Sequence, residues 1–100
     1  MAIYINKEKA QFYLSTPPNE KWFYLKNGEI LRNIYELKEF FSNCSEEVYK
    51  EYKTDFYNWV VGVFQNDRLA MGLKSSRTSK EAILYTDRNI KMLERNANRL

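Results

Sequence analysis

The chain has 100 residues with 44% hydrophobic and 16% aromatic side chains, so we expect one self-supporting domain rather than a disordered segment. It contains no histidine and a single cysteine, which excludes histidine-based catalysis, thiolate zinc sites and an intrachain disulfide. Its three glycines form no phosphate-binding loop, and no signal peptide or apolar stretch of membrane-spanning length is visible. These features predict a cytoplasmic protein with no cofactor, no bound metal, no membrane contact and no small-molecule substrate.

The net charge of +3 is unevenly distributed along the chain. Residues 1–65 carry 8 Lys and Arg against 9 Asp and Glu, whereas residues 66–100 carry 8 against 4. The basic excess therefore lies entirely in the last third. Such a local excess concerns the choice of partner and not the fold.

The first residues are expected to form an arm outside the main domain. Ala2–Asn6 alternates weakly and fits a short strand or a packed arm. Ser15–Asn19, with two consecutive prolines, is the clearest break, because each proline fixes φ and removes an amide donor. We therefore predict an N-terminal arm or strand with a Pro-Pro connection over 1–19 and a compact domain of hairpin and helices over 20–97.

A β-hairpin is predicted directly after this break. Lys21–Lys26 and Glu29–Arg32 would be its two strands, joined by Asn27-Gly28. Asn-Gly supplies the two positive-φ positions of a type I′ turn, the favoured two-residue link between antiparallel strands. Because a lone hairpin is marginally stable in water, its apolar face is expected to lie on the helices.

The strongest apolar pattern in the chain lies between Asp55 and Ala70. Five large apolar residues recur there at helical spacing and predict one buried stripe: Phe56, Trp59, Val60, Val63 and Phe64. Thr54 or Asp55 can cap the start of this helix, because a short side-chain oxygen accepts a hydrogen bond from a free amide of the first turn. We expect the rest of the domain to pack around this helix, with Trp59 at the centre.

Capping signals predict the other helices. Two capping boxes are recognisable, one at Asn33 and Glu36 and the other at Thr78 and Glu81. Helices are therefore predicted near 34–42, 46–53, 55–65, 67–73 and 79–96. The expected fold is mainly α within the α+β class, with an N-terminal β-hairpin packed on a bundle of about five short helices, the last one longest.

Three carboxylates, Glu47, Glu51 and Asp55, are spaced by four and would stack on one face of a continuous helix. One interpretation is a site for a hard cation or an acid–base pair. The other is a solvated helix face on which Lys50 and Lys53 supply ion-pair partners. We favour the solvated face, because no other candidate ligand converges there.

Cys44 lies between a predicted helix end and a predicted helix start. A thiol near a helix N-terminus can have a lowered pKa and become reactive. A lone cysteine is more often a small buried hydrophobe, and we favour that interpretation.

The last predicted helix carries two distinct faces. The first, called the basic stripe, consists of Arg88, Lys91, Arg95 and Arg99. It could contact phosphates, but we favour the interpretation that cations near a helix C-terminus complement the helix dipole and keep the surface soluble. The second is a heptad-like series with apolar spacing of three and four: Ile83, Thr86, Ile90, Leu93, Ala97 and Leu100. This second face can dock on the domain or pair with another helix, and Ile83, Ile90 and Leu93 are its candidate helix-pairing residues.

Three short patterns resemble a family of small archaeal and bacterial domains of unknown function. They are Gly28 followed by Glu36-Leu37, D-F-x-x-W-V at Asp55–Val60, and V-F-x-x-D-x-L-A at Val63–Ala70. The resemblance covers roughly the last three quarters of the chain. Members of the family often carry a histidine ahead of the D-F pair, and this chain has none. The resemblance implies a compact, mainly helical prokaryotic domain and brings no activity with it.

The functional prediction follows from the strength of the packing signals and the weakness of the catalytic ones. We expect a non-enzymatic interaction or adaptor domain that acts through protein–protein contacts, including self-association. The alternative is a nucleic-acid-binding accessory protein that uses the basic stripe, since Lys and Arg contact phosphates and the many tyrosines can stack on bases.

Overall fold

The computed structural model describes residues 6–98, most of which are helical. In chain order the described elements are α1 (Lys7–Leu14), a 3-10 turn η1 (Asn19–Lys21), β1 (Phe23–Tyr24), β2 (Ile30–Leu31), α2 (Ile34–Asn43), α3 (Glu46–Trp59), a π-helical turn η2 (Val60–Phe64), α4 (Asp67–Ser75) and α5 (Ser79–Ala97). The expected fold class is confirmed: a small antiparallel hairpin accompanies a helical bundle whose last helix is the longest.

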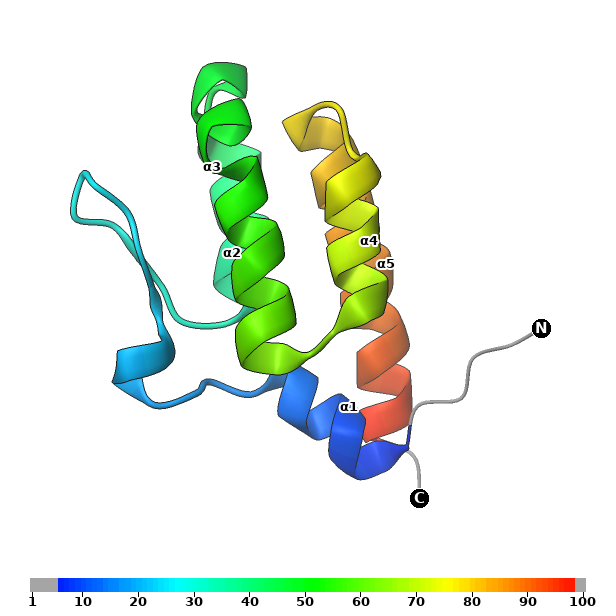
Figure 1. Cartoon of the computed structure of the whole chain (residues 1–100). Coiled ribbons are helices and arrows are strands. Elements are labelled where there is room, and N and C mark those ends of the chain that lie inside the picture. Colours follow the sequence, from blue (N-terminus) through cyan, green and yellow to red (C-terminus); the bar gives the residue numbers. More distant parts are fainter. Residues whose placement is uncertain (1–5, 99–100) are drawn as a thin grey trace.

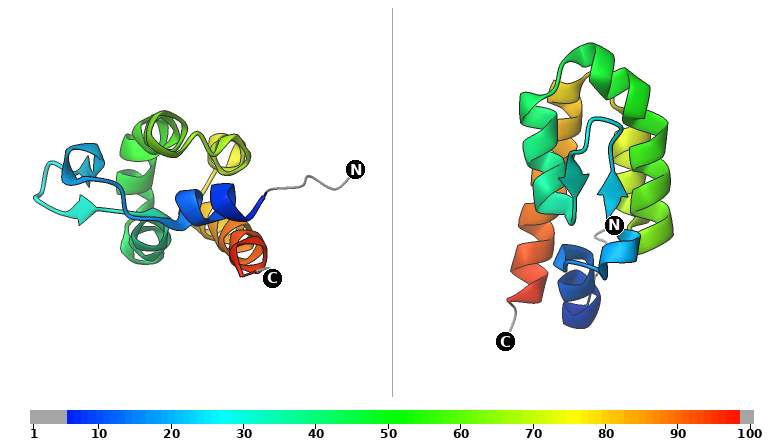
Figure 2. Two further views of the ribbon diagram at one scale, coloured as in Figure 1. Left: turned by 90° about the horizontal axis from the view of Figure 1, so that it is seen from below. Right: turned by 90° about the vertical axis from the view of Figure 1, so that its left-hand side faces the viewer.

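The four helices from α2 to α5 form an elongated bundle (Figure 1). α3 and α4 lie in front of α2 and α5 in this view, and α1 lies at the lower end, where it packs against α5. The hairpin lies on the α2 and α3 side of the bundle, away from α4 and α5 (Figure 2). None of the helices described is both long enough and apolar enough to cross a membrane.

Each of the five α-helices described begins with a side-chain cap. A side-chain oxygen of the residue before the helix accepts a hydrogen bond from the third backbone amide beyond it, at Asn6, Asn33, Ser45, Asn66 and Thr78. The caps at Asn33 and Thr78 were predicted and are confirmed. Their glutamates differ from a strict capping box, because Glu36 accepts from the Arg32 amide and Glu81 from the Arg77 amide.

The predicted break between two helices at Thr54 and Asp55 is wrong. α3 runs continuously from Glu46 to Trp59, so both residues lie in its interior and neither caps a helix start. Ser45 is the cap of the whole helix, and its hydroxyl accepts from the Val48 amide at 3.2 Å. A helix with one good cap and an uninterrupted apolar stripe gains nothing from a second start.

α1 is a helix that the sequence prediction missed. Only Ala10 and Tyr13 of this helix are buried, and its other apolar residues, Phe12 and Leu14, do not continue their spacing, so the apolar periodicity is weak. Ala10 and Tyr13 belong to the core formed by the other elements, and the Tyr13 hydroxyl donates to the Gln65 carbonyl at 3.1 Å. The strand or arm predicted for Ala2–Asn6 lies, except for the capping Asn6, outside the described residues.

The hairpin forms where it was predicted, with a different turn. Its strands pair antiparallel, Phe23 opposite Leu31 and Tyr24 opposite Ile30. Of the two predicted positive-φ residues, Gly28 adopts a φ of 95° and Asn27 does not, so the turn is not type I′. The Gly28 amide donates to the Leu25 carbonyl at 3.1 Å, as in hairpin loops that end in a left-handed glycine.

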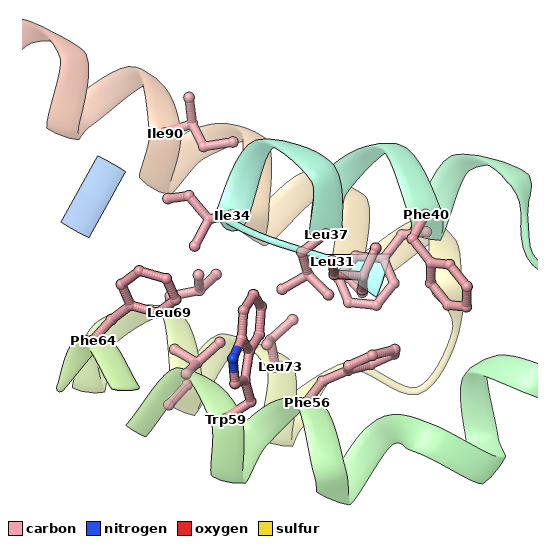
Figure 3. Close-up of a cluster of buried hydrophobic side chains, with 14 of the residues drawn as sticks. Leu31, Ile34, Leu37, Phe40, Phe56, Trp59, Phe64, Leu69, Leu73 and Ile90 are labelled. Carbon is pink, nitrogen blue, oxygen red and sulfur yellow. The ribbon is translucent and has the colours of Figure 1, made fainter. Parts of the chain in front are cut away.

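The predicted organising helix does lie at the centre of the core (Figure 3). The ring of Phe56 lies 4.9 Å from Phe23 and 5.4 Å from Phe41, measured between centroids. Trp59 is 8% exposed, and its indole N–H donates to the Lys21 carbonyl at 2.8 Å. α3 is thereby fixed to the segment that leads into the hairpin.

The heptad-like face of the last helix is used inside the domain. Ile90 is 4% exposed, while Thr86 and Leu93 are fully buried. Ile83 and Ala97 are half-buried against the same core, and Leu100 lies outside the described residues. Of the two predicted uses of this face, docking on the domain is the one observed, so Ile90 and Leu93 do not offer an exposed surface to another helix.

Candidate functional site

The stacked carboxylates of α3 remain on its solvent face. Glu47, Glu51 and Asp55 are all exposed, and Glu51 lies 3.6 Å from the Lys26 ammonium. Within residues 6–98 no three His, Cys, Asp or Glu side chains are arranged to hold a metal ion. The arrangement corresponds to the solvated face favoured above.

Cys44 lines a shallow groove of about 460 Å³ between the hairpin and the ends of α2 and α3. The groove also carries the carboxylates of Glu29, Glu36 and Glu39. Burial raises the pKa of the Cys44 thiol, and the negative charge of Glu46 raises it further. A raised pKa lowers the thiolate fraction at neutral pH, so this environment opposes the reactivity considered for Cys44.

The described part of the basic stripe is exposed on α5. Arg88, Lys91 and Arg95 are all solvent-accessible, and Arg99 lies outside the described residues. Lys91 is engaged within the helix, since its ammonium lies 3.0 Å from the Asp87 carboxylate. The members of the basic stripe therefore differ: Lys91 forms an ion pair within α5, whereas no ion pair with a described residue is found for Arg88 or Arg95.

Two arginines of the stripe line an open groove between α4 and α5, which we call the basic groove. Its volume is about 580 Å³. Its lining residues are Arg68, Leu69, Met71, Gly72, Ser75, Tyr85, Arg88, Asn89, Met92 and Arg95. None of these residues carries a carboxylate, whereas three carry a guanidinium group.

Two contacts set α4 and α5 antiparallel and side by side, as Figure 1 shows. At one end the amide of Asn66, which also caps α4, donates to the Asn89 side-chain oxygen at 3.0 Å. At the other end Gly72 faces Tyr85, and a Cβ on Gly72 would lie only 3.0 Å from the tyrosine ring. The missing side chain of Gly72 therefore lets Tyr85 lie close against α4.

Two acidic residues of α5, Asp87 and Glu94, are directed away from the basic groove, toward α2. Asp87 accepts a 2.7 Å ion pair from Lys38 of α2, and Glu94 accepts from the Tyr35 hydroxyl at 2.9 Å. These partners keep the Asp87 pKa low, through hydrogen bonds first from Lys38 and then from Lys91. In the middle and last part of α5, Asp87 and Glu94 therefore lie on the α2 side, and Arg88 and Arg95 lie on the groove side.

The polar groups of the groove are hydrogen-bond donors. The Asn89 side-chain oxygen is occupied by Asn66, and no described residue accepts from the Asn89 amide. The Asn89 side chain is only 6% exposed, so little of this amide is accessible from the groove. The Ser75 hydroxyl already donates to backbone carbonyls of α4. The basic groove therefore presents guanidinium N–H groups that lack acceptors from the described part of the chain.

The remaining lining is apolar and partly exposed. Met71 is 57% exposed and Tyr85 is 40% exposed, while Met92, two helical turns from Tyr85 along α5, is half-buried. Leu84, next to Tyr85 on α5, is 55% exposed. An apolar end and an arginine-rich end thus lie along the same groove.

Arg68 is the charged residue of this site that the sequence prediction missed; Met71, Tyr85 and Met92 were not predicted as site residues either. Arg68 belongs to α4, a helix to which the sequence analysis assigned no site residue. The spacing of Arg88 and Arg95 shows within one helix that they share a face, whereas the position of Arg68 beside them depends on how two helices pack. Only the antiparallel pairing of α4 and α5 could have revealed it.

Comparison with known proteins adds no relative: no family model, no curated protein sequence and no solved structure matches this chain.

Proposed function

We propose that the chain is a non-enzymatic interaction domain that acts through protein–protein contacts made at the basic groove. The observation that carries this proposal is an open groove that combines exposed Met71 and Tyr85 with three arginines and contains no carboxylate. Interface cores are enriched in methionine, aromatic residues and arginine and depleted in acidic residues. A cytoplasmic setting belongs to the proposal and is supported by the single cysteine of the sequence.

Self-association is one form that these contacts can take. Because Ile90 and Leu93 are buried, a second copy would have to contact the exposed end of the groove instead of the heptad-like face. Met71→Asp is the appropriate variant for sizing, since Met71 is exposed and its substitution leaves the core intact. A concentration-dependent dimer that disappears in Met71→Asp would identify a second copy as a partner.

The test of the proposal compares two charge-reversal variants. The groove variant is Arg88→Glu/Arg95→Glu, and the control variant is Lys21→Glu/Lys26→Glu, at the hairpin side of the bundle. Both change the net charge by the same amount. We expect the parent and the control variant to capture the same protein from a nuclease-treated extract of the cells that encode the chain, and the groove variant to lose it. Equal capture by all three would show that the groove is not the contact surface.

Nucleic-acid binding at the same arginines is the second candidate. It is supported by the three guanidinium groups and by Tyr85, whose exposed ring can stack on a base. Three phosphate contacts predict a slope of log affinity against log salt of about −2 for single strands and about −3 for duplex DNA. Such salt-sensitive binding, lost in the groove variant and kept in the control variant, would replace the protein-contact proposal.

A further inference from the structure

The geometry points to an acidic amphipathic helix of a partner protein as the occupant of the basic groove. This inference rests on the proposed function and adds the chemistry and shape of the partner. It follows from the shape of the groove, the charges along it and the order of its apolar and basic parts.

The shape of the groove fits a helix. α4 and α5 lie antiparallel, and the furrow between two such helices accepts a third helix that packs against both. α4 has nine residues, so the furrow extends for about 13 Å, or between two and three helical turns. An amphipathic helix laid in such a furrow contacts it through residues at i, i+3 or i+4, and i+7.

The charges of the groove require an anionic partner surface. Arg68 and Arg88 lie at a similar level on the antiparallel helices, because Asn66 pairs with Asn89 beside them. Arg95 lies two helical turns beyond Arg88 on the same face of α5, about 10 Å past the level at which α4 begins. The three guanidinium groups offer only donors, which carboxylates satisfy in charge-assisted hydrogen bonds.

The apolar part of the groove separates a helix of protein from a strand of nucleic acid. Met71, Tyr85 and Met92 line one continuous wall together with the arginines. Leucine or isoleucine side chains of an amphipathic helix can cover the two methionines, whose flexible side chains adapt to different apolar shapes. A nucleic-acid strand would satisfy the arginines with its phosphates and Tyr85 with a base, but it would leave Met71 and Met92 without an apolar partner, so the helix matches more of the groove.

A second copy of the chain fits the groove less well. Its carboxylate face on α3, with Glu47, Glu51 and Asp55, contains no large exposed apolar residue among those described. The described hairpin has exposed Tyr24 and Ile30 but carries more lysine and arginine than acid. The groove beside Cys44 does combine Glu29, Glu36 and Glu39 with exposed Ile30, but it is concave and does not offer a ridge that could enter the basic groove.

The methionines provide direct reporters for a test. The sequence contains three methionines, and two of them, Met71 and Met92, line the groove. With ¹³C-labelled methionine methyl groups, the full chain is titrated with a side-chain-stapled peptide of about 14 residues, a length that covers the groove and needs the staple to stay helical. This acidic peptide carries leucines at helical spacing flanked by glutamates. The control is a basic peptide in which the leucines are kept and each glutamate is replaced by lysine.

The acidic peptide is expected to shift both groove methyl signals saturably, and the basic peptide is expected to shift neither. In Arg88→Glu/Arg95→Glu its affinity should fall by about tenfold or more, and in Lys21→Glu/Lys26→Glu by less than about twofold. A backbone amide spectrum of each variant verifies that the fold is retained. Unmoved Met71 and Met92 signals, or equal affinity in the groove variant, would overturn the inference.

Two further experiments test whether the basic groove binds a different occupant. A single-stranded oligonucleotide that displaces the acidic peptide and shifts the same methyl groups more tightly would assign the groove to nucleic acid. A chain lacking residues 1–5 whose Met71 and Met92 signals differ from those of the parent would assign it to the chain's own first residues. Either result overturns the inference. If the acidic peptide fails while protein capture still depends on Arg88 and Arg95, only the acidic helix is rejected and the proposed function stands.

Discussion

At the scale of single residues, Trp59 shows how one side chain joins several elements. Its ring lies 5.8 Å from Phe23 and 5.3 Å from Phe64, and its N–H reaches the Lys21 carbonyl. Removing it would create a cavity and leave that carbonyl without its donor. Trp59→Ala is therefore expected to lower the free energy of unfolding by about 3–5 kcal/mol, measured by urea denaturation with circular dichroism.

The other tryptophan of the chain is the matched control. Trp22 is half-buried, and its N–H donates to the Pro17 carbonyl at 2.8 Å within the connection to the hairpin. Because it lies outside the buried core, Trp22→Ala should cost less than about 2 kcal/mol. A Trp59→Ala protein that melts within a degree or two of the parent would contradict the central position assigned to α3.

At the scale of elements, the start of α3 depends on a single cap. Ser45→Ala removes the hydroxyl that accepts from the Val48 amide and should cost about 1 kcal/mol. Thr54→Ala, in the exposed interior of the same helix, should change stability by less than about 0.5 kcal/mol, because alanine is the better helix former there. Chemical denaturation of both variants measures the difference. The reverse order, with Thr54→Ala the more costly, would mean that a helix begins at that residue.

The contact between α3 and α5 makes stability depend on pH. The Glu46 carboxylate accepts hydrogen bonds from the Ser79 hydroxyl and from the Ser79 amide, the latter at 3.0 Å. These bonds, first the side-chain one, lower the Glu46 pKa in the folded state. A lowered folded-state pKa contributes stability above the unfolded-state value, about 4.3 for glutamate, and this stability is lost as pH falls through the folded-state pKa.

Glu46→Gln is accordingly expected to flatten the decrease in unfolding free energy between about pH 5 and pH 2. Urea midpoints at pH 6, 4 and 3 measure this slope. Glu47→Gln is the neighbouring control, because no described residue forms a hydrogen bond or ion pair with the Glu47 carboxylate. Identical slopes for Glu46→Gln and the parent would show that the contact with Ser79 does not stabilise the fold.

The sequence predicted those elements whose signals are local. Asn33 and Thr78 predict the starts of α2 and α5, because a capping residue directly precedes its helix in the chain. The same reasoning failed at Thr54, since a residue able to cap a helix is also tolerated inside one. α1 was missed because its buried residues, Ala10 and Tyr13, are too few to produce a clear period, and its place in the core depends on contacts with α5.

The residues of the candidate site also fall into two groups, those predictable from local spacing and those that depend on tertiary packing. Arg88 and Arg95 could be predicted because seven residues bring two side chains to the same face of one helix. Arg68 could not, because it reaches the groove only through the packing of α4 on α5. The direction of Asp87 toward α2 also depends on a distant residue, Lys38. A count of charges along the last third therefore understates how strongly they are separated in space.

At the scale of the whole molecule, the bundle has two unlike sides. One side carries the hairpin and, beside it, the exposed carboxylates of α3. The other is formed by α4 and α5 and carries the basic groove. The net charge of +3 therefore understates the positive potential at the basic groove. A positive groove favours anionic ligands over cationic ones and speeds their association.

Arg68, Arg88 and Arg95 are proposed to act together as one contact surface, which differs from the stripe seen in the sequence. The most direct measurement compares the affinity of the acidic peptide for Arg68→Gln and Lys91→Gln, each of which removes one positive charge. Arg68 lines the groove, whereas Lys91 is held by Asp87 outside it. Arg68→Gln is predicted to weaken binding by about three- to tenfold and Lys91→Gln by less than about twofold. Stronger weakening by Lys91→Gln, or no effect of Arg68→Gln, would contradict the claim.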